Sequence, residues 1–161
     1  MTTSIFSSMN ILDEFIANGV ACIPLNTVTR EFRQAVIHNY RMIQVKNIVG
    51  LNIVCNLSVI PSIEELGKGS WEIVINNNYL PSLAETLRNS FSGSSINENY
   101  IPWAPDEICE RSEDQGSEAS LARTEFALEE WKKRMEKDRW TIARVLYEHM
   151  DQRRVSNHPI I

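Results

Sequence analysis

The chain offers few residues whose types and spacing could carry out chemistry. Its three histidines and three cysteines are scattered over 161 residues, and none of them has the short spacing of a metal-ligand pair. The sequence also has no phosphate-binding glycine loop, no nucleophile elbow and no metalloprotease helix motif. We therefore expect no catalytic residues, no enzymatic activity and no cofactor, and we look for a function in binding or assembly.

The densest group of titratable side chains is acidic and lies in a stretch of about residues 92–117. Ser, Gly and Pro punctuate this stretch, which predicts a long loop. Neighbouring carboxylates raise one another's pKa, so such a cluster could bind Ca2+ weakly or take up protons. A solvated loop without a ligand is the competing interpretation, and metal binding stays open. The members of this carboxylate cluster are Glu98, Asp106, Glu107, Glu110, Glu113, Asp114 and Glu118.

Composition is that of an ordinary globular protein, and we expect one domain over residues 1–161. Hydrophobic residues make up 43% of the chain, charged residues 23%, and the net charge is −5. This acidic balance argues against a broad basic face for duplex nucleic acid, although it leaves room for a few arginines in a groove. No apolar run approaches the ~20 residues of a membrane span, and the first residues do not resemble a secretory signal. We expect a cytosolic chain that does not bind membranes.

Hydrophobic periodicity predicts mainly helical structure. A first helix is expected over residues 10–23, a second from Thr27 or Thr29 to about residue 44, and a third over about 80–91.

Strands are expected only in the middle of the chain. Short half-buried strands are expected between residues 48 and 63 and at 71–75, with Gly67-Lys68-Gly69 as a turn. Trp71, Ile73 and Ile75 should share the inner face of the second of these strands.

The last expected element is a long helix over about residues 118–152. Its apolar positions alternate at spacings of three and four, which is typical of a heptad-like seam; they include Leu121, Thr124, Leu128, Trp131 and Met135. The patch Lys137-Asp138-Arg139 is the place where this helix could divide in two. Together these elements predict a mainly α fold, an antiparallel four-helix bundle with a small β-sheet at one end and a long acidic loop.

Several segments, taken in order, resemble the coat proteins of rod-shaped plant viruses of the tobacco mosaic virus type. They are Ile5-Phe-Ser-Ser before the first helix, Thr29-Arg-Glu-Phe-Arg-Gln, Ser70-Trp-Glu-Ile-Val-Ile, and Trp140-Thr-Ile-Ala-Arg-Val-Leu-Tyr-Glu. The paired arginines that this family places after its third helix are replaced here by Ser92-Gly-Ser-Ser, with Arg88 just before them.

The resemblance implies a structural capsid protein that assembles helically with copies of itself around single-stranded RNA, in a virion and in the host cytoplasm. It implies RNA contacts from Arg88 and Arg123, and then from Arg30 and Arg33. Repulsion within the carboxylate cluster would make such an assembly depend on pH. The alternative is a small acidic helical binding or inhibitor module that contacts a basic partner protein through its acidic loop.

Overall fold

The computed structural model describes residues 25–48, 59–105, 117–137 and 139–156, with side chains from Leu121 onward in the third range. The chain divides into two compact units. Unit 1 comprises residues 1–98 and 139–161, and unit 2 comprises residues 99–138. The helix expected over residues 10–23 and most of the strand region expected between 48 and 63 lie outside the described residues.

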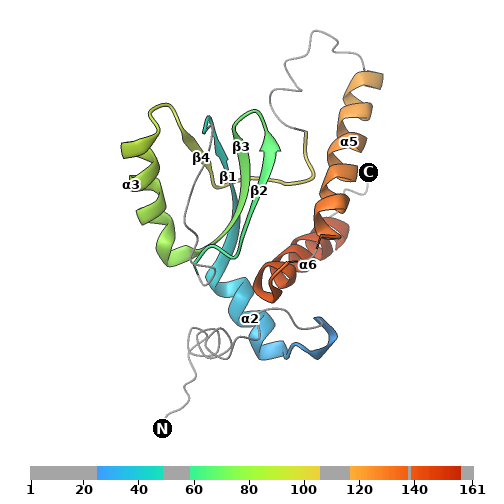
Figure 1. Ribbon diagram of the computed structural model, residues 1–161. Coiled ribbons are helices and arrows are strands. Elements are labelled where there is room, and N and C mark those ends of the chain that lie inside the picture. Colours follow the sequence, from blue (N-terminus) through green and yellow to red (C-terminus); the bar gives the residue numbers. More distant parts are fainter. Residues whose placement is uncertain (1–24, 49–58, 106–116, 138, 157–161) are drawn as a thin grey trace. The chain divides into compact units, whose positions relative to one another are not determined.

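Unit 1 is built on a four-stranded antiparallel sheet with the spatial order β2-β3-β1-β4 (Figure 1). A sheet of this size is not a small cap at the end of a helical bundle, so the expected four-helix bundle is wrong. The strands are β1 (Tyr40–Lys46), β2 (Ser62–Gly67), β3 (Ser70–Asn76) and β4 (Ser95–Asn97).

The error arises where the second helix ends. Helix α2 (Arg30–Asn39) begins as expected, because Thr29 caps it and accepts a hydrogen bond from the Phe32 N–H at 3.1 Å. It stops at Asn39, however, and the chain continues directly as β1. Tyr40 and Ile43 extend the helical stripe, but in β1 they lie on opposite faces of the sheet, because this central strand is buried on both faces. Pairing with β3 makes residues 40–46 a strand rather than a continuation of α2.

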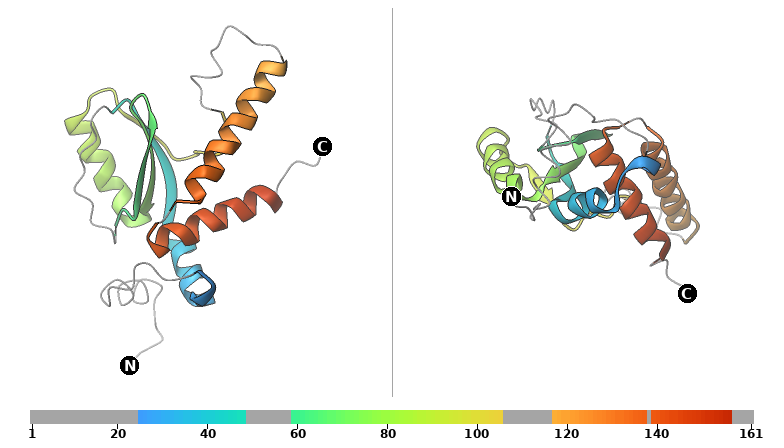
Figure 2. Two further views of the ribbon diagram at one scale, coloured as in Figure 1. Left: turned by 45° about the vertical axis from the view of Figure 1, so that its right-hand side comes forward. Right: turned by 90° about the horizontal axis from the view of Figure 1, so that it is seen from below.

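One face of the sheet is apolar and is covered by α3 (Leu80–Ser90), as both views in Figure 2 show. The strand at 71–75 and the third helix are thereby confirmed. The core on this face consists of Ile43, Val45, Ile73 and Ile75 from the sheet and Leu80, Leu83 and Leu87 from α3.

The β2–β3 turn brings two backbone segments close together, which requires glycine. The backbone angle φ is 98° at Gly67 and 77° at Gly69, in the region that glycine adopts without strain. A Cβ on Gly69 would lie 3.2 Å from the backbone of Ile48, whose N–H donates to the Gly69 carbonyl at 3.0 Å. The turn expected at Gly67-Lys68-Gly69 is therefore confirmed.

The stretch expected as one long final helix contains two. Helix α5 (Ser117–Met135) belongs to unit 2, and α6 (Thr141–Ser156) belongs to unit 1 and lies on the side of the sheet opposite α3 (Figure 2). The interruption falls at the patch of residues 137–139. The loop expected over 92–117 also holds an edge strand, β4, and its residues 106–116 lie outside the described part of the chain.

Candidate functional site

The arginines expected to contact RNA are spread over three helices. Arg30 is exposed at the start of α2, and Arg88 is exposed in the last turn of α3. These two segments lie at opposite ends of unit 1 (Figure 1). Arg123 is half-buried on α5 in unit 2 and interacts with another residue of the chain. Within unit 1, the expected arginines therefore do not share one surface.

Arg33 connects α2 with its neighbours. Its Nη1 donates to the Glu148 carboxylate on α6, and its Nη2 donates to the Leu25 carbonyl at 2.5 Å. Leu25 belongs to the short helix η1 (Leu25–Thr27). The guanidinium of Arg33 is thus engaged in holding three elements of unit 1 together.

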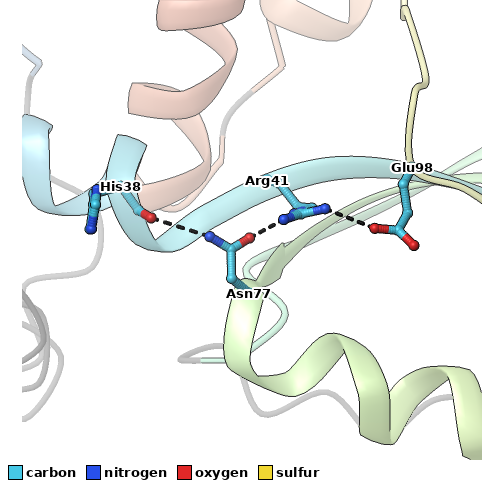
Figure 3. A network of polar contacts seen from close by, with 4 residues as sticks. All are labelled: His38, Arg41, Asn77 and Glu98. Atoms are coloured by element: carbon cyan, nitrogen blue, oxygen red, sulfur yellow. Dashed lines mark hydrogen bonds and ion pairs between the residues drawn. The ribbon is translucent and has the colours of Figure 1, made fainter.

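Glu98 is the only member of the carboxylate cluster whose side chain is described, and it forms an ion pair (Figure 3). Arg41 of β1 donates to Glu98 at 2.9 Å and to Asn77 Oδ1 at 2.8 Å, while Asn77 Nδ2 donates to the His38 carbonyl at 3.2 Å. This exposed network joins β1 to η2 (Asn77–Tyr79) and to the end of β4. Among the described residues, no group of three or more His, Cys, Asp or Glu side chains is placed to hold a metal ion.

The remaining cluster members cannot be placed in the same way. Asp106, Glu107, Glu110, Glu113 and Asp114 lie outside the described residues. Glu118 is in the first turn of α5, and its side chain is outside the description as well.

The face of the sheet opposite α3 buries polar groups that the sequence did not reveal. Glu72 of β3 is fully buried and accepts a hydrogen bond from the hydroxyl of Tyr147 on α6. The Arg139 guanidinium lies 4.4 Å from the centre of the Tyr147 ring and donates to Ser62 Oγ at 2.7 Å and Glu64 at 3.4 Å. These contacts fasten the start of α6 to β2 and β3.

Strand register explains why these groups lie together. Glu72 is opposite Gln44 of β1 and opposite Glu64 of β2, so one polar row crosses a single face of the sheet. Period-two alternation correctly placed Trp71 and Ile73 on the other face, but it could not show that α6 covers the polar one. Because the contacts of Glu72 and Arg139 join β2, β3 and α6, we assign this cluster a structural role.

His149 on α6 gives unit 1 a measurable pH dependence. Burial, followed by the charge of Arg153, lowers the pKa of His149 below its ordinary 6.5. As the pH falls below about 6.5, the unfolded chain takes up the proton more readily than the folded chain, so stability decreases. We expect His149→Gln to reduce the loss of unfolding free energy between pH 7.5 and pH 5.5, measured with urea. An undiminished loss in the His149→Gln variant would contradict this assignment.

Unit 2 contains, among its described residues, one fully buried aromatic side chain, which contacts a second aromatic ring of the same unit. Trp131 of α5 is fully buried and meets Trp103 edge-on, with ring centres 5.6 Å apart and planes at 64°. Buried Arg134 donates from Nη2 to the Pro102 carbonyl at 3.1 Å. These contacts fix the segment at residues 102–103 against the C-terminal half of α5.

Exposed apolar side chains gather in unit 2. Leu121 is 59% exposed, Phe126 is 62% exposed and Ile101 is 52% exposed. Among the described residues, five large hydrophobic side chains are exposed, and three of them belong to unit 2, which has 40 of the 161 residues. These side chains are available for contact with another molecule, but Leu121 and Phe126 lie about 140° apart around α5 and do not form one patch.

Unit 2 also carries the whole net charge of the protein. It contains 11 acidic and 6 basic residues, a net charge of −5, whereas unit 1 is balanced with 10 of each. Most of this charge lies at residues 106–130, which hold nine acids and two arginines. Net charge and exposed apolar side chains therefore coincide in one quarter of the chain.

The chain matches no family model, and comparison with curated proteins and with solved structures finds no significant similarity. No helix in the described part of the chain is both long enough and apolar enough to cross a membrane.

Proposed function

We propose that this protein is a binding module that contacts a basic partner protein through unit 2. The observation that carries the proposal is the coincidence of the entire net charge of −5 with three exposed apolar side chains in 40 residues. Carboxylates would attract and orient the partner, while burial of exposed apolar side chains on the contacting side of unit 2, Leu121 among them, would hold it.

Unit 1 would serve as the scaffold in this proposal. Unit 1 has no net charge, so it would not attract a partner of either charge over a long range. Its sheet is covered on one face by α3 and on the other by α6. A neutral, well-packed body that carries one charged element is suited to presenting that element to a partner.

The capsid function remains a prediction from the resemblance, although the described residues contain a four-stranded sheet in place of the four-helix bundle that the resemblance implied. Light scattering at pH 5 and pH 8, with the ratio of absorbance at 260 and 280 nm, separates the two functions. A monomer of 18.5 kDa at both pH values, without nucleic acid, would support the binding module. Rods that grow at pH 5 and absorb at 260 nm would support the capsid and contradict our proposal.

Charge reversal on unit 2 tests the binding function directly. We expect the double variant Glu125→Lys, Glu129→Lys to bind the basic proteins cytochrome c and ribonuclease A about tenfold more weakly than the wild type at low salt. Both residues are exposed on α5, so the reversal should leave the fold intact. Affinity is measured by isothermal titration calorimetry at two salt concentrations, because screening should weaken wild-type binding.

The matched control places the same charge change on unit 1. Glu65 and Glu85 are exposed there, and Glu65→Lys with Glu85→Lys alters the total charge by the same amount. The proposal expects this control to retain most of the wild-type affinity. Equal losses in both double variants would show that total charge alone governs binding and would contradict a site on unit 2.

A further inference from the structure

The apolar seam of α5 is covered along only part of its length. Leu121, Thr124, Leu128 and Trp131 follow one another at spacings of three and four residues, so they lie along one side of the helix. Trp131 is fully buried and Leu128 is half-buried, whereas Thr124 is exposed and Leu121 is 59% exposed. The seam is thus incompletely covered from Leu121 to Leu128, which is roughly 10 Å of helix at 1.5 Å per residue.

Two unpaired carboxylates lie beside the uncovered part of the seam. Glu125 and Glu129 are exposed, one helical turn apart, and neither forms a hydrogen bond or an ion pair with another described residue. Lys133 forms an ion pair with Glu130 at 3.1 Å, and Glu129 also interacts with Lys133 through its charge, since both carboxylates raise the pKa of Lys133. Lys132 is exposed on the same side of the seam, about 20° around the helix from Glu125, so this edge carries carboxylates beside Leu121 and a cation nearer to Trp131. The part of the edge with Glu125 and Glu129 is the complement of a helix that has lysines or arginines beside an apolar stripe.

Phe126 does not belong to this seam. With about 100° per residue, it lies about 140° around the helix from Leu121, on the side away from Leu128 and Trp131. It is nevertheless exposed to nearly the same extent as Leu121, at 62% against 59%. Substitutions of Leu121 and Phe126 can therefore be compared directly, because the two side chains are similarly exposed but lie on different sides of α5.

We infer that the uncovered seam of α5 docks a basic amphipathic helix of the partner protein, with the partner's apolar stripe on Leu121 and Leu128 and its cations against Glu125 and Glu129. This inference rests on the proposed function and specifies its surface. The seam is continuous with the part that Trp103 already contacts at Trp131, and its acidic edge matches a cationic helix.

The test uses a synthetic helical peptide of defined composition, Leu-Lys-Lys-Leu-Leu-Lys-Leu-Leu-Lys-Lys-Leu-Leu-Lys-Leu, labelled for fluorescence anisotropy. Its counterpart with Glu in place of every Lys is the charge control and should not bind. We expect Leu121→Ser to weaken binding of the Lys peptide about tenfold, because an exposed leucine that becomes buried loses its apolar contact. Phe126→Ser should change the affinity by less than about twofold, since that side chain faces away from the seam.

The outcomes separate this inference from the proposed function. Equal weakening by Leu121→Ser and Phe126→Ser, or no effect of Leu121→Ser, would overturn docking on the seam. Either of these results could be found while the Glu125→Lys, Glu129→Lys variant still binds the Lys peptide more weakly than the wild type. In that case unit 2 remains the binding site, and only docking on the seam is contradicted. Binding of the Glu peptide as tightly as the Lys peptide would overturn both, because charge would then play no part. Circular dichroism of each variant confirms that α5 is retained.

Discussion

Replacing Arg139 by alanine is expected to lower the free energy of unfolding by about 3–5 kcal/mol. The side chain is only 7% exposed and its ion-pair partner Glu64 is 16% exposed. Alanine would leave the Glu64 carboxylate poorly solvated without that cation, and it would remove the guanidinium that lies over the Tyr147 ring. Because Arg139 fastens the start of α6 to β2, the loss should weaken the packing of α6 on the sheet.

Urea unfolding followed by far-ultraviolet circular dichroism measures this effect. Arg154→Ala is the matched control, since Arg154 lies on the same helix and pairs with Asp151 at 2.9 Å, but with side chains 17% and 25% exposed. That pair joins residues three apart on one helix and should contribute at most about 1 kcal/mol. Similar losses of unfolding free energy in the two variants would show that the Arg139 contacts stabilise the fold no more than the Arg154–Asp151 pair does.

Replacing Trp131 by alanine is expected to cost about 3–5 kcal/mol, for a different physical reason. Trp131 is the largest fully buried side chain among the described residues, and its ring meets Trp103 edge-on. Alanine would leave a cavity at the base of α5 and remove the aromatic contact.

Trp131→Phe separates the cavity from the loss of aromatic character. Phenylalanine keeps an aromatic ring at this position, so its cost should be clearly smaller than that of alanine. Chemical unfolding gives the free energies, and near-ultraviolet circular dichroism reports the Trp103 environment. An alanine variant within about 1 kcal/mol of the wild type would contradict the packing described for unit 2.

The sequence predicted an element correctly where the local pattern of residues favours the same structure as the packing of that element in the fold. Thr29 caps α2, the Gly67-Lys68-Gly69 turn joins β2 to β3, and α3 presents its leucines to the sheet, all from residues adjacent in sequence. Strand β1 was missed because Tyr40 and Ile43 continue the helical stripe, whereas a central strand buried on both faces does not alternate between polar and apolar residues. These residues form a strand because they pair with β3, which lies about 30 residues later in the chain.

The candidate site was predictable in its charge but not in its geometry. Acidic residues between 92 and 130 are evident from the sequence, whereas the seam of α5 predicts a buried Leu121 that the structure leaves 59% exposed. Glu72, Tyr147 and Arg139 lie on elements far apart in the chain, and no spacing rule could bring them together. Their burial depends on the packing of α6 against the sheet, which is a tertiary property.

The most direct test of the account is a nuclear magnetic resonance titration of the labelled protein with the basic amphipathic peptide. The account predicts that amide shifts concentrate in residues 121–129 of α5, while the sheet and α3 of unit 1 remain unchanged. Shifts spread evenly over both units, or confined to unit 1, would contradict the claim that unit 2 is the binding surface of this protein.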